Sequence, residues 1–565
     1  MVCQGQLDSV VPLEPATMPG RVVVQWDKDD CADMGIVKVD LLGLGMMAVL
    51  EDSLKSIRDD YGEEVDLSRL PANDELVYKT LQKADTVGMF QIESRAQMAC
   101  LPRLHPVCFY DIVVQVAIIR PGPIVGQMVN PYLKRRQGRE PVTCLHPSLE
   151  PVLARTLGVP LFQEQLLRMA MIAAGFSGGE AEELRRAFGF KRSEKRMKDV
   201  ELKLRRGMDK NGISGETQET IIRSITSFAL YGFPESHAAS FALIAYASAY
   251  LKCHYLAAFT AAMLNNQPMG FYQPPSLVTD AQRHGLRVRP IDITCSNWLC
   301  TLEKIEEKFA VRLGLRYVKG LRAEIGAEIV RERAARPFTS VDDLKRRVPR
   351  IQKAELAVLA EVGALNRLGN ERGFHRRSAL WQVERTARSA GPLYELCDDV
   401  RKNDLEENVL IESASENDDS APSPLAQMTA EERLVADYRG TGMTVGPHPM
   451  TYHRAELRKM GIRSAAELPH LPDGMQVRIA GGVIARQRPG TAKGFVFLSM
   501  EDETGIANAI ISPQLFEECH VVVVHQQFLM IEGQLQNQDN VVSVKSQRIR
   551  PLTITSAPTT SHDFH

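Results

Sequence analysis

The longest apolar pattern in the chain lies in residues 228–264, where alanine, leucine and aromatic residues dominate. No charged residue occurs between Ala238 and Leu251, so the pattern predicts a buried, alanine-rich core helix. This uncharged run of 14 residues is too short for a membrane span, which needs roughly 20. Packing in a protein core is therefore the expected role of most of this segment.

A tight turn precedes that helix and carries the residues with chemical interest. The turn is Tyr231-Gly232-Phe233-Pro234, and Ser236 is the expected N-cap because its hydroxyl can accept from a backbone N–H of the first turn. Glu235 and His237 then stand at the mouth of the helix.

Other helices are predicted from similar patterns. Residues 70–101 look helical, residues 162–174 form an amphipathic pattern, and another helix begins at Gly178-Gly179. The polar residues Gln91, Glu93 and Arg95 are typical of an exposed helix start.

Residues 312–369 contain two helix-turn units with glycine turns near 318–321 and 361–365. Paired turns of this kind are similar to tandem helix-hairpin-helix elements, which contact the DNA backbone through N–H groups. A plain helical hairpin gives the same pattern. If the motif is present, Lys319 and Gly320 are candidate DNA contacts.

From residue 476 the hydrophobic period changes from helical to alternating. The five predicted strands are residues 477–484, 495–500, 506–511, 528–533 and 541–544. With a helix near 513–519, this order predicts an OB-fold, a barrel that often binds single strands. Its candidate DNA contacts are Arg486, Arg488, Lys493 and Phe495. Phe497 shares a face with Phe495, so one of the two rings can belong to the core.

The charge is small overall but unevenly distributed. The net charge is −2, yet residues 120–210 hold 18 Lys or Arg against 10 Asp or Glu, and residues 395–437 hold 3 against 13. The basic block suggests a polyanion partner, although a solvated face is the commoner reason for such runs. Its candidate contacts are Arg120, Lys134, Arg135, Arg136, Lys191 and Arg192. The acidic block is expected to be a linker.

The cysteines and the beginning of the chain indicate a reducing compartment. Ten cysteines occur without any Cys-x-x-Cys pair, so reduced structural thiols are expected. No basic stretch followed by an apolar core marks a signal peptide, and we expect a cytoplasmic protein without a membrane partner.

One carboxylate lies inside an apolar run. Residues 36–42 follow an acid-rich loop at 26–33 and read as a buried strand that contains Asp40. A buried acid is costly unless it is paired or binds a metal. Asp40 can therefore be a metal ligand, the cap of the next helix, or a partner of Lys38.

Several of these segments together resemble the bacterial C-family DNA polymerases of the replicative alpha-subunit type. The motifs, in family order, are VKVDLLGL (37–44), GMFQIESR (88–95), RPGP (120–123), QEQ (163–165), LRRAFG (184–189) and YGFPESHAAS (231–240). Three further segments resemble the error-prone, damage-induced branch, namely NNQPMGFY (265–272), GFHRRSALW (373–381) and RQRPGTAKGFVF (486–497).

The resemblance implies template-directed nucleotidyl transfer with two metal ions, usually Mg²⁺, held by three aspartates. Asp40 matches the third aspartate and Lys38 would lie near the triphosphate, which makes both candidate catalytic residues. The residues that match the nucleotide-binding positions are Arg185, Arg186, Tyr231, Gly232, Phe233 and His237. The implied partners are primer-template DNA, deoxynucleoside triphosphates, and a sliding clamp or a partner polymerase-like protein. Gln514-Leu515-Phe516 resembles a clamp-binding motif only superficially.

The chain departs from the family at the other two metal aspartates. In relatives they form a D-x-D strand upstream of the third, whereas the D-x-D of Asp27 and Asp29 lies in the acid-rich loop. The chain thus resembles the C-terminal half of an error-prone polymerase, an N-terminally truncated form. The alternative is a non-catalytic module that binds primer-template and single strands.

The expected fold class is α+β and multidomain, mainly α in the fingers. The predicted domains are a palm-edge remnant (1–44), fingers (45–300), a helix-hairpin-helix region (301–394), an acidic linker with connecting helices (395–472), an OB-fold (473–553) and a disordered tail (554–565).

Overall fold

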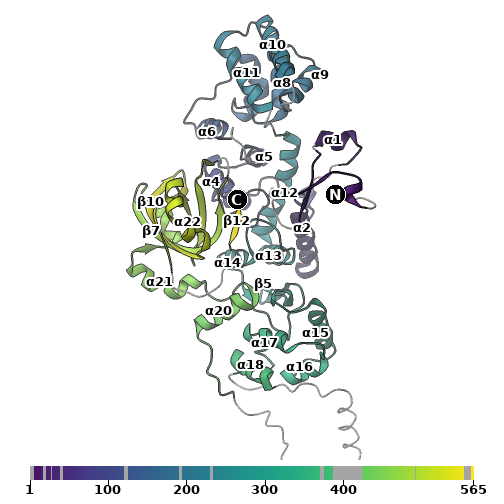
Figure 1. Ribbon diagram of the computed structural model, residues 1–565, viewed down its shortest axis with the longest axis vertical. Helices are drawn as coiled ribbons and strands as arrows, with labels where there is room; N and C mark the ends of the chain where they lie inside the picture. Colours follow the sequence, from purple (N-terminus) through teal and green to yellow (C-terminus); the bar gives the residue numbers. More distant parts are fainter. Residues whose placement is uncertain are drawn as a thin grey trace, which may run out of the picture.

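The computed structural model describes residues 6–16, 21–26, 28–37, 42–119, 125–189, 194–229, 233–368, 374–385, 423–489, 492–552 and 561–564. The molecule is elongated, with α8–α11 at one end, α15–α18 at the other and a β-barrel beside the middle (Figure 1). In the described part of the chain, every helix is too short or too polar to cross a membrane.

The central apolar segment forms two helices where one was expected. Helix α12 spans Glu235–His254 and α13 spans Leu256–Asn265, with a break at Tyr255, whose φ of −131° is not helical. The N-cap is Pro234 rather than Ser236, because the backbone N–H of Glu235 donates to the Glu164 carboxylate and needs no later cap.

Helix α12 packs against helices that come from much earlier in the chain. They are α2 (Leu44–Ser56), α3 (Glu75–Gln82) and α5 (Phe109–Ile118). Ala242, Ala245 and Ala249 are fully buried in this interface, so the alanine-rich sequence lets neighbouring helices come close.

The helix predicted over residues 70–101 is wrong in its middle. Helix α3 ends at Gln82 and α4 spans Arg95–Leu104. Between them the backbone is left-handed at Ala84, Gly88 and Gln91, with φ of 56°, 78° and 61°, which a right-handed helix cannot contain.

The basic block folds as a bundle at one end of the molecule. Helix α6 (Val125–Arg136) packs beside α4 and α5, and the bundle itself consists of α7 (Glu150–Leu153), α8 (Gln163–Ala174), α9 (Gly178–Gly189), α10 (Glu194–Lys210) and α11 (Gly215–Ala229). The predicted boundaries of α8 and the predicted start of α9 are confirmed. Leu166, Met169, Leu204 and Ile221 are among the residues of its separate buried core.

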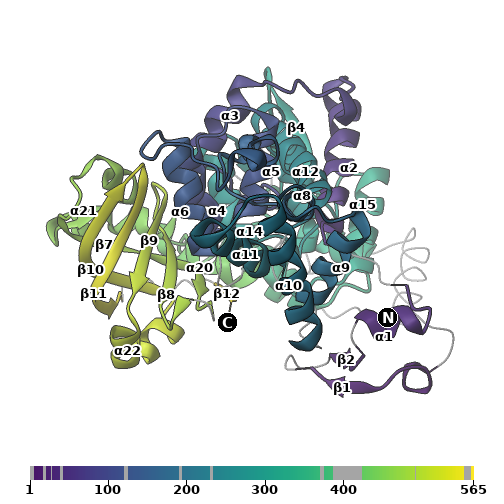
Figure 2. The ribbon, with the colours of Figure 1, turned by 90° about the horizontal axis from the view of Figure 1, so that it is seen from above.

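The first 44 residues follow the expected pattern only in part. Strands β1 (Leu13–Pro15) and β2 (Val22–Val24) form an antiparallel pair, and α1 (Lys28–Asp33) replaces most of the expected acidic loop. Acidic residues near the start of α1 suit the positive end of a helix dipole. These elements lie to one side of the helical body (Figure 2).

The buried strand predicted over residues 36–42 is not observed at its described ends. Val37 is 83% exposed and Leu42 is 61% exposed, so neither has the burial that the apolar pattern indicated. Among the described residues β1 and β2 have no third strand beside them, and a lone two-stranded sheet offers little surface for a buried neighbour. Residues 38–41, including Asp40, lie outside the described residues.

The helix-hairpin-helix region is confirmed and contains a small sheet that the pattern missed. Helix α14 (Pro274–Arg283) precedes β3 (Val288–Arg289), β4 (Thr301–Ile305) and β5 (Lys308–Arg312). The helices that follow are α15 (Ala323–Ala335), α16 (Val341–Arg347), α17 (Lys353–Glu361) and α18 (Arg376–Arg385). Gly320 and Gly363 occupy the predicted turns with φ of +82° and +83°.

The second part of the predicted linker region is folded. Residues 386–422 lie outside the described residues, but α20 (Ala430–Thr441) and α21 (Pro449–Lys459) follow. Helix α20 docks on α17 through Gly440, where a Cβ atom would meet Val362 at 2.3 Å. Only glycine therefore allows this close approach.

The C-terminal domain is a closed five-stranded barrel with OB topology. Its elements are β7 (Gln476–Gln487), β8 (Val496–Glu501), β9 (Ile506–Ile511), α22 (Pro513–His525), β10 (Phe528–Gln538) and β11 (Val541–Pro551). Around the barrel the order is β7, β8, β9, β11, β10 and back to β7, with β9 and β11 parallel and the other pairs antiparallel. The predicted OB-fold and the α+β class are confirmed, with longer strands than expected.

Two short strands extend the barrel at β7. Strand β6 (Ile462–Arg463) and β12 (His562–Phe564) both pair with β7 in parallel. Residues 562–564 are therefore ordered, contrary to the expected disordered tail, and the ion pair of Asp563 with Arg486 at 3.2 Å stabilises that strand.

Candidate nucleotide and DNA interface

The first turn of α12 is fixed to the start of α8. Phe233 forms a β-bridge with Phe162, and the backbone N–H of Gln163 donates to the Phe233 carbonyl at 3.0 Å. The Glu235 N–H donates to the Glu164 carboxylate at 2.9 Å. The QEQ and YGFPESH motifs, about 70 residues apart in sequence, thus form one local structure.

The side chain of Glu235 is held by Tyr110 and Arg155, which belong to neither α8 nor α12. Its carboxylate accepts from the Tyr110 hydroxyl at 3.1 Å and lies 3.7 Å from Arg155. The Arg155 guanidinium also covers the Tyr110 ring, 4.0 Å from its centroid. The mouth of α12 is therefore a rigid surface rather than a frayed helix end.

His237 is half-buried in an aromatic row on this surface. Its ring centroid lies 5.2 Å from that of Phe233 and 4.1 Å from that of Phe241. The structure brings together Phe233 and His237 of the expected nucleotide site. Tyr231 and Gly232 lie outside the described residues.

The arginines expected to hold the nucleotide phosphates lie on α9. Arg185 and Arg186 fall within this helix, in the turn after the buried Leu184, and their side chains are not among those described. Five other candidates lie outside the described residues, namely Arg120, Lys191, Arg192 and the candidate catalytic residues Lys38 and Asp40.

Two of the three basic residues at the end of α6 are used inside the molecule. Arg135 donates to the carbonyls of Thr143 and Leu157 at 3.0 and 2.7 Å, and Arg136 pairs with the buried Asp111 at 2.7 Å. Lys134 is exposed. Within this trio, only Lys134 presents its charge fully to solvent.

The first hairpin turn of the helix-hairpin-helix region is partly covered by α20. The Lys319 backbone N–H donates to the Gly440 carbonyl at 2.8 Å, and its ammonium donates to the Tyr438 carbonyl at 3.1 Å. A backbone N–H that is already used cannot bind a phosphate. Gly320 is exposed, and the space around its Cα is open.

The candidate residues of the barrel separate into two groups. Arg486 is mostly buried and donates to the Val523 and Gln526 carbonyls at 2.7 and 2.6 Å, which is a structural role. The exposed members are in the loop between β7 and β8, and they are Arg488, Lys493 and Phe495. Phe495 is 36% exposed, so its ring is available for stacking.

The fingers cover another part of the barrel. Arg95 lies 4.7 Å from the centroid of the Phe497 ring and donates to the Ala509 carbonyl at 3.0 Å. Asp539, in the turn between β10 and β11, pairs with Arg139 and lies 3.9 Å from Arg103. Strands β8 and β9 and this turn are the parts of an OB-fold that usually bind oligonucleotides. Here they face α4 and the segment after α6.

The expected exposed helix start at Gln91, Glu93 and Arg95 is therefore wrong, because all three are partly buried. Burial lowers the pKa of Arg95 to about 10. Burial also raises the pKa of Glu93 to about 7, although its carboxylate accepts from the backbone N–H groups of Phe271 and Gly88, each at 2.8 Å. The only sequence signal was the high polarity of GMFQIESR, which periodicity alone assigns to solvent.

One cluster of possible metal ligands lies at the other end of α12. Asp85, Asp280 and His284 bring their ligand atoms within 4.8 Å of one another. The buried ammonium of Lys252 lies 2.8 Å from Asp280 and 3.6 Å from Asp85. Because Lys252 and His284 together pair with both carboxylates, the cluster fits a structural ion network better than a divalent metal site.

The resemblance of Gln514-Leu515-Phe516 to a clamp-binding motif has no structural support. These residues begin α22, and Leu515 and Phe516 pack against the barrel core. The Leu515 N–H also donates to the Ser512 hydroxyl at 3.4 Å.

Three family models match successive parts of the chain. The Bacterial DNA polymerase III alpha NTPase domain matches residues 1–43, and the Bacterial DNA polymerase III alpha subunit finger domain matches residues 46–212. A helix-hairpin-helix motif matches residues 285–375.

Several error-prone DNA polymerases are similar to the chain over nearly its whole length. The chain is 47% identical to Error-prone DNA polymerase 2 of Agrobacterium fabrum over 97% of its own length, and 46% identical to Error-prone DNA polymerase 2 of Rhizobium meliloti over 97%. It is 44% identical to the Error-prone DNA polymerase of Anaeromyxobacter dehalogenans strain 2CP-C over its full length. In each case the chain spans 49% of the relative. The chain therefore belongs to the bacterial C-family DNA polymerases of the DNA polymerase III alpha type, within the error-prone branch, and corresponds to the C-terminal half of those relatives.

Proposed function

We propose that this chain supplies the fingers, the DNA-backbone contacts and the OB-fold of an error-prone DNA polymerase that copies damaged templates in the cytoplasm. The observation that carries the proposal is the anchored mouth of α12. There Phe233 and His237 form an aromatic surface that is fixed to α8 by backbone hydrogen bonds. Such a rigid surface suits the stacking of an incoming deoxynucleoside triphosphate against the template.

The phosphate and DNA contacts follow from the positions of the basic residues. Arg185 and Arg186 would hold the nucleotide phosphates as guanidinium forks. Lys134, Gly320, Lys493 and Phe495 are exposed and suited to contact primer-template DNA or a single strand. Arg120, Lys191 and Arg192 remain candidates from the sequence.

Polymerases of this kind use two divalent ions, for which Mg²⁺ is the proposed cofactor. Asp40 would be one ligand, and Lys38 would lie beside the triphosphate. A single carboxylate cannot hold two ions, so a complete centre requires carboxylates in addition to Asp40. The described Asp85–Asp280–His284 cluster is a poor source of them, because Lys252 and His284 already pair with its two carboxylates.

A chimera tests the proposed function directly. The chain replaces the corresponding half of the Agrobacterium fabrum relative, and primer extension is measured on intact and abasic templates. We expect an active chimera, and Asp40→Ala should lower its rate by about 100-fold or more because a metal ligand is lost. The exposed Asp342→Ala serves as the control and should leave the rate unchanged. An active chimera that tolerates Asp40→Ala would remove Asp40 from the metal site.

The second candidate function is a DNA-binding module without catalysis. It is favoured by the exposed basic and aromatic side chains of Lys134, Lys493 and Phe495, and it predicts that the chain alone binds primer-template without adding nucleotides. Its log affinity should fall linearly with log salt concentration. Extension by the chain alone would exclude this candidate. Any link to a sliding clamp would then run through a partner polymerase-like protein, since the Gln514 motif is part of the barrel.

A further inference from the structure

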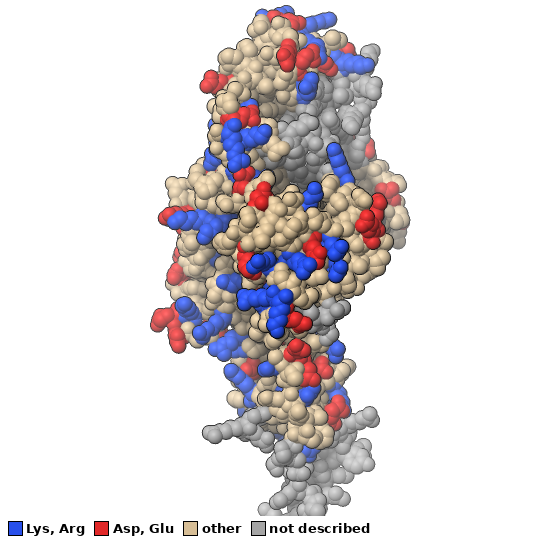
Figure 3. Space-filling view, turned by 90° about the vertical axis from the view of Figure 1, so that its left-hand side faces the viewer, with Lys and Arg blue, Asp and Glu red and all other residues tan. Residues whose placement is uncertain are grey.

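Basic side chains gather on the face where the barrel and α21 lie. Figure 3 shows Lys and Arg across the middle of this face, with fewer Asp and Glu among them. The face includes the outer surface of β7, β10 and β11, which is the side of the barrel away from strands β8 and β9. Exposed basic residues of this surface are Arg463, Arg478, Lys545, Arg548 and Arg550.

A β-bulge gives this surface its particular geometry. The pairing of β10 with β11 shifts by one residue between Glu532 and Gly533, so that Gln547 is the extra residue. As a result Gln547 and Arg548 are both exposed, although successive residues of a regular strand point to opposite faces.

The bulge also places three charged residues in a row across three strands. Glu532 on β10 stands opposite Arg478 on β7 and opposite Arg548 on β11. Its carboxylate lies 3.1 Å from the Arg478 Nε and 3.7 Å from the nearer Arg548 nitrogen. One acid therefore orients two guanidinium groups.

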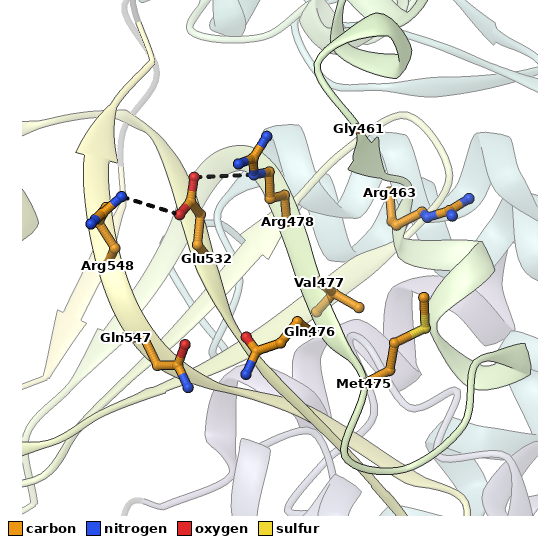
Figure 4. A pocket seen from close by; sticks show the side chains of 9 residues that line it. All are labelled: Gly461, Arg463, Met475, Gln476, Val477, Arg478, Glu532, Gln547 and Arg548. Carbon is orange, nitrogen blue, oxygen red and sulfur yellow. Dashed lines mark ion pairs between the residues drawn. The ribbon is translucent and has the colours of Figure 1, made fainter.

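This row forms one wall of a pocket of about 470 Å³ (Figure 4). The β6 segment with Gly461 and Arg463 borders it on one side, and Gln476 and Gln547 lie below the row, where their amide groups point toward one another. Three arginines against one glutamate leave the lining with a net charge of +2.

The two oriented guanidinium groups keep most of their hydrogen-bonding capacity. Each has five N–H donors. Arg478 uses one on Glu532 and one on the Met460 carbonyl at 3.1 Å, and its side chain remains 52% exposed. Arg548 remains 61% exposed. Donors held in place but directed to solvent suit the oxygens of a phosphate group.

The ligand of this pocket is inferred from the fact that the usual binding face of the barrel is covered. The β8–β9 face and the β10–β11 turn, where an OB-fold ordinarily binds a strand, are covered by Arg95, Arg103 and Arg139. We propose that the pocket around Arg478, Glu532 and Arg548 binds the phosphodiester backbone of single-stranded DNA, on the side of the barrel opposite the usual one. The proposal rests on the DNA-binding part of the proposed function.

The first test measures the salt dependence of single-strand binding. The full chain is titrated into a fluorescein-labelled oligothymidylate, and the fluorescence anisotropy is recorded over a series of salt concentrations. Arg478→Gln with Arg548→Gln should weaken binding about tenfold at low salt. The slope of log affinity against log salt should fall by about 1.4, since each phosphate contact on a single strand contributes about 0.7.

The matched control removes the same charge elsewhere. Arg58→Gln with Arg69→Gln neutralises two exposed arginines that also pair with neighbouring acids, Asp59 and Asp66. This variant should keep the wild-type slope. Equal slopes for the two double variants would overturn the proposal.

A variant that should raise the affinity distinguishes a loss of DNA contacts from a loss of folding. Glu532→Gln releases both arginines from their acid and should raise oligothymidylate affinity about threefold, which an unfolded barrel cannot do. An unchanged or lower affinity of a folded Glu532→Gln protein would contradict the proposal. Free dATP gives a further test. If dATP binding requires Arg478 and Arg548 while oligothymidylate binding does not, the pocket binds a small nucleotide and the proposal is overturned.

The outcomes distinguish this inference from the proposed function. If the wild-type chain binds neither oligothymidylate nor primer-template at low salt, the DNA-binding function itself fails. If it binds both and the pocket variants behave like the control, only the pocket proposal fails.

Discussion

His284 has two acidic neighbours that come from different parts of the chain. Its Nε2 lies 2.6 Å from Asp85, and its Nδ1 lies 3.7 Å from Asp280 on the same helix. The buried Lys252 faces the same two carboxylates. The hydrogen bond that the His284 ring donates to the Asp85 carboxylate is the main cause that raises the pKa of His284 to about 8.

This raised pKa predicts a pH-dependent stability. The folded pKa lies above the unfolded value of 6.5, so the stabilisation is complete below about pH 6.5 and is lost as the pH rises through 8. We expect His284 to contribute about 1 kcal/mol to the fall in unfolding free energy between pH 6 and pH 9, because its side chain is one-third exposed. Urea unfolding of wild type, His284→Gln and the exposed control His520→Gln at both pH values measures this. Equal pH dependence in all three would contradict it.

Gly533 shows how one residue determines the shape of the barrel surface. A Cβ atom at this position would lie 2.2 Å from the Lys545 carbonyl oxygen on the neighbouring strand. Gly533→Ala should therefore push β10 and β11 apart at the bulge and cost about 2 kcal/mol or more. Gly505→Ala is the matched control, because its Cβ would meet only Ala465 at 3.6 Å. Thermal unfolding of both variants tests the difference, and equal melting temperatures would contradict the close approach.

At the scale of elements, the barrel docks on the fingers through charged contacts as well as through Ile484 and Ile506, which pack against an apolar core cluster of the fingers. Asp539 accepts from Arg139 at 3.1 Å and lies near Arg103, while Arg95 reaches the edge of β9. The hydrogen bond with Arg139 is the main cause that lowers the pKa of the Asp539 carboxyl. Exposed pairs of this kind contribute about 0.2–1 kcal/mol each, so loss of the Asp539 pair should loosen the interface without separating the barrel from the fingers.

Asp539→Asn tests this docking while keeping the turn, since asparagine also tolerates the left-handed φ of 54° found there. We expect amide hydrogen exchange in β8 and β9 to become about two- to fivefold faster, because Arg95 then covers these strands for a smaller fraction of time. Asp342→Asn, an exposed acid remote from the barrel, is the control. Exchange rates equal to wild type would show that Asp539 does not hold the interface.

The elements that sequence reasoning found are those whose signals are local. The alternation after residue 476 predicted the barrel, and the turns at Gly320 and Gly363 predicted the hairpins, because each depends on a few neighbouring residues. The break at Tyr255 and the turn between α3 and α4 were missed. The apolar pattern runs through the break at Tyr255, and the polar residues of the α3–α4 turn read as the start of a helix. The contacts that hold this turn come from distant parts of the chain, such as Ser248 and Phe271.

At the scale of the whole molecule, the candidate site was predicted only in part. The aromatic mouth of α12 was expected from the YGFPESH motif, and the structure shows Phe233 and His237 side by side. Arg135, Arg136 and Arg486 looked like DNA contacts because positive charge in sequence does not reveal an internal partner. The row of Arg478, Glu532 and Arg548 has no sequence signal, since the bulge that forms it depends on register between strands.

The uneven charge of the chain leads to a prediction about the molecule as a whole. Residues 403–422 contain seven acidic and no basic side chains, although the net charge of the full chain is only −2. Such a segment would repel the DNA that the basic block and the barrel are proposed to attract. Replacing each of these acids by its amide should raise oligothymidylate affinity about two- to fivefold at 50 mM salt. The gain should vanish near 1 M salt, where the screening length falls to about 3 Å. An unchanged melting temperature would show that the variant is folded. A gain in oligothymidylate affinity that persisted at high salt would contradict an electrostatic origin, because salt screens long-range repulsion.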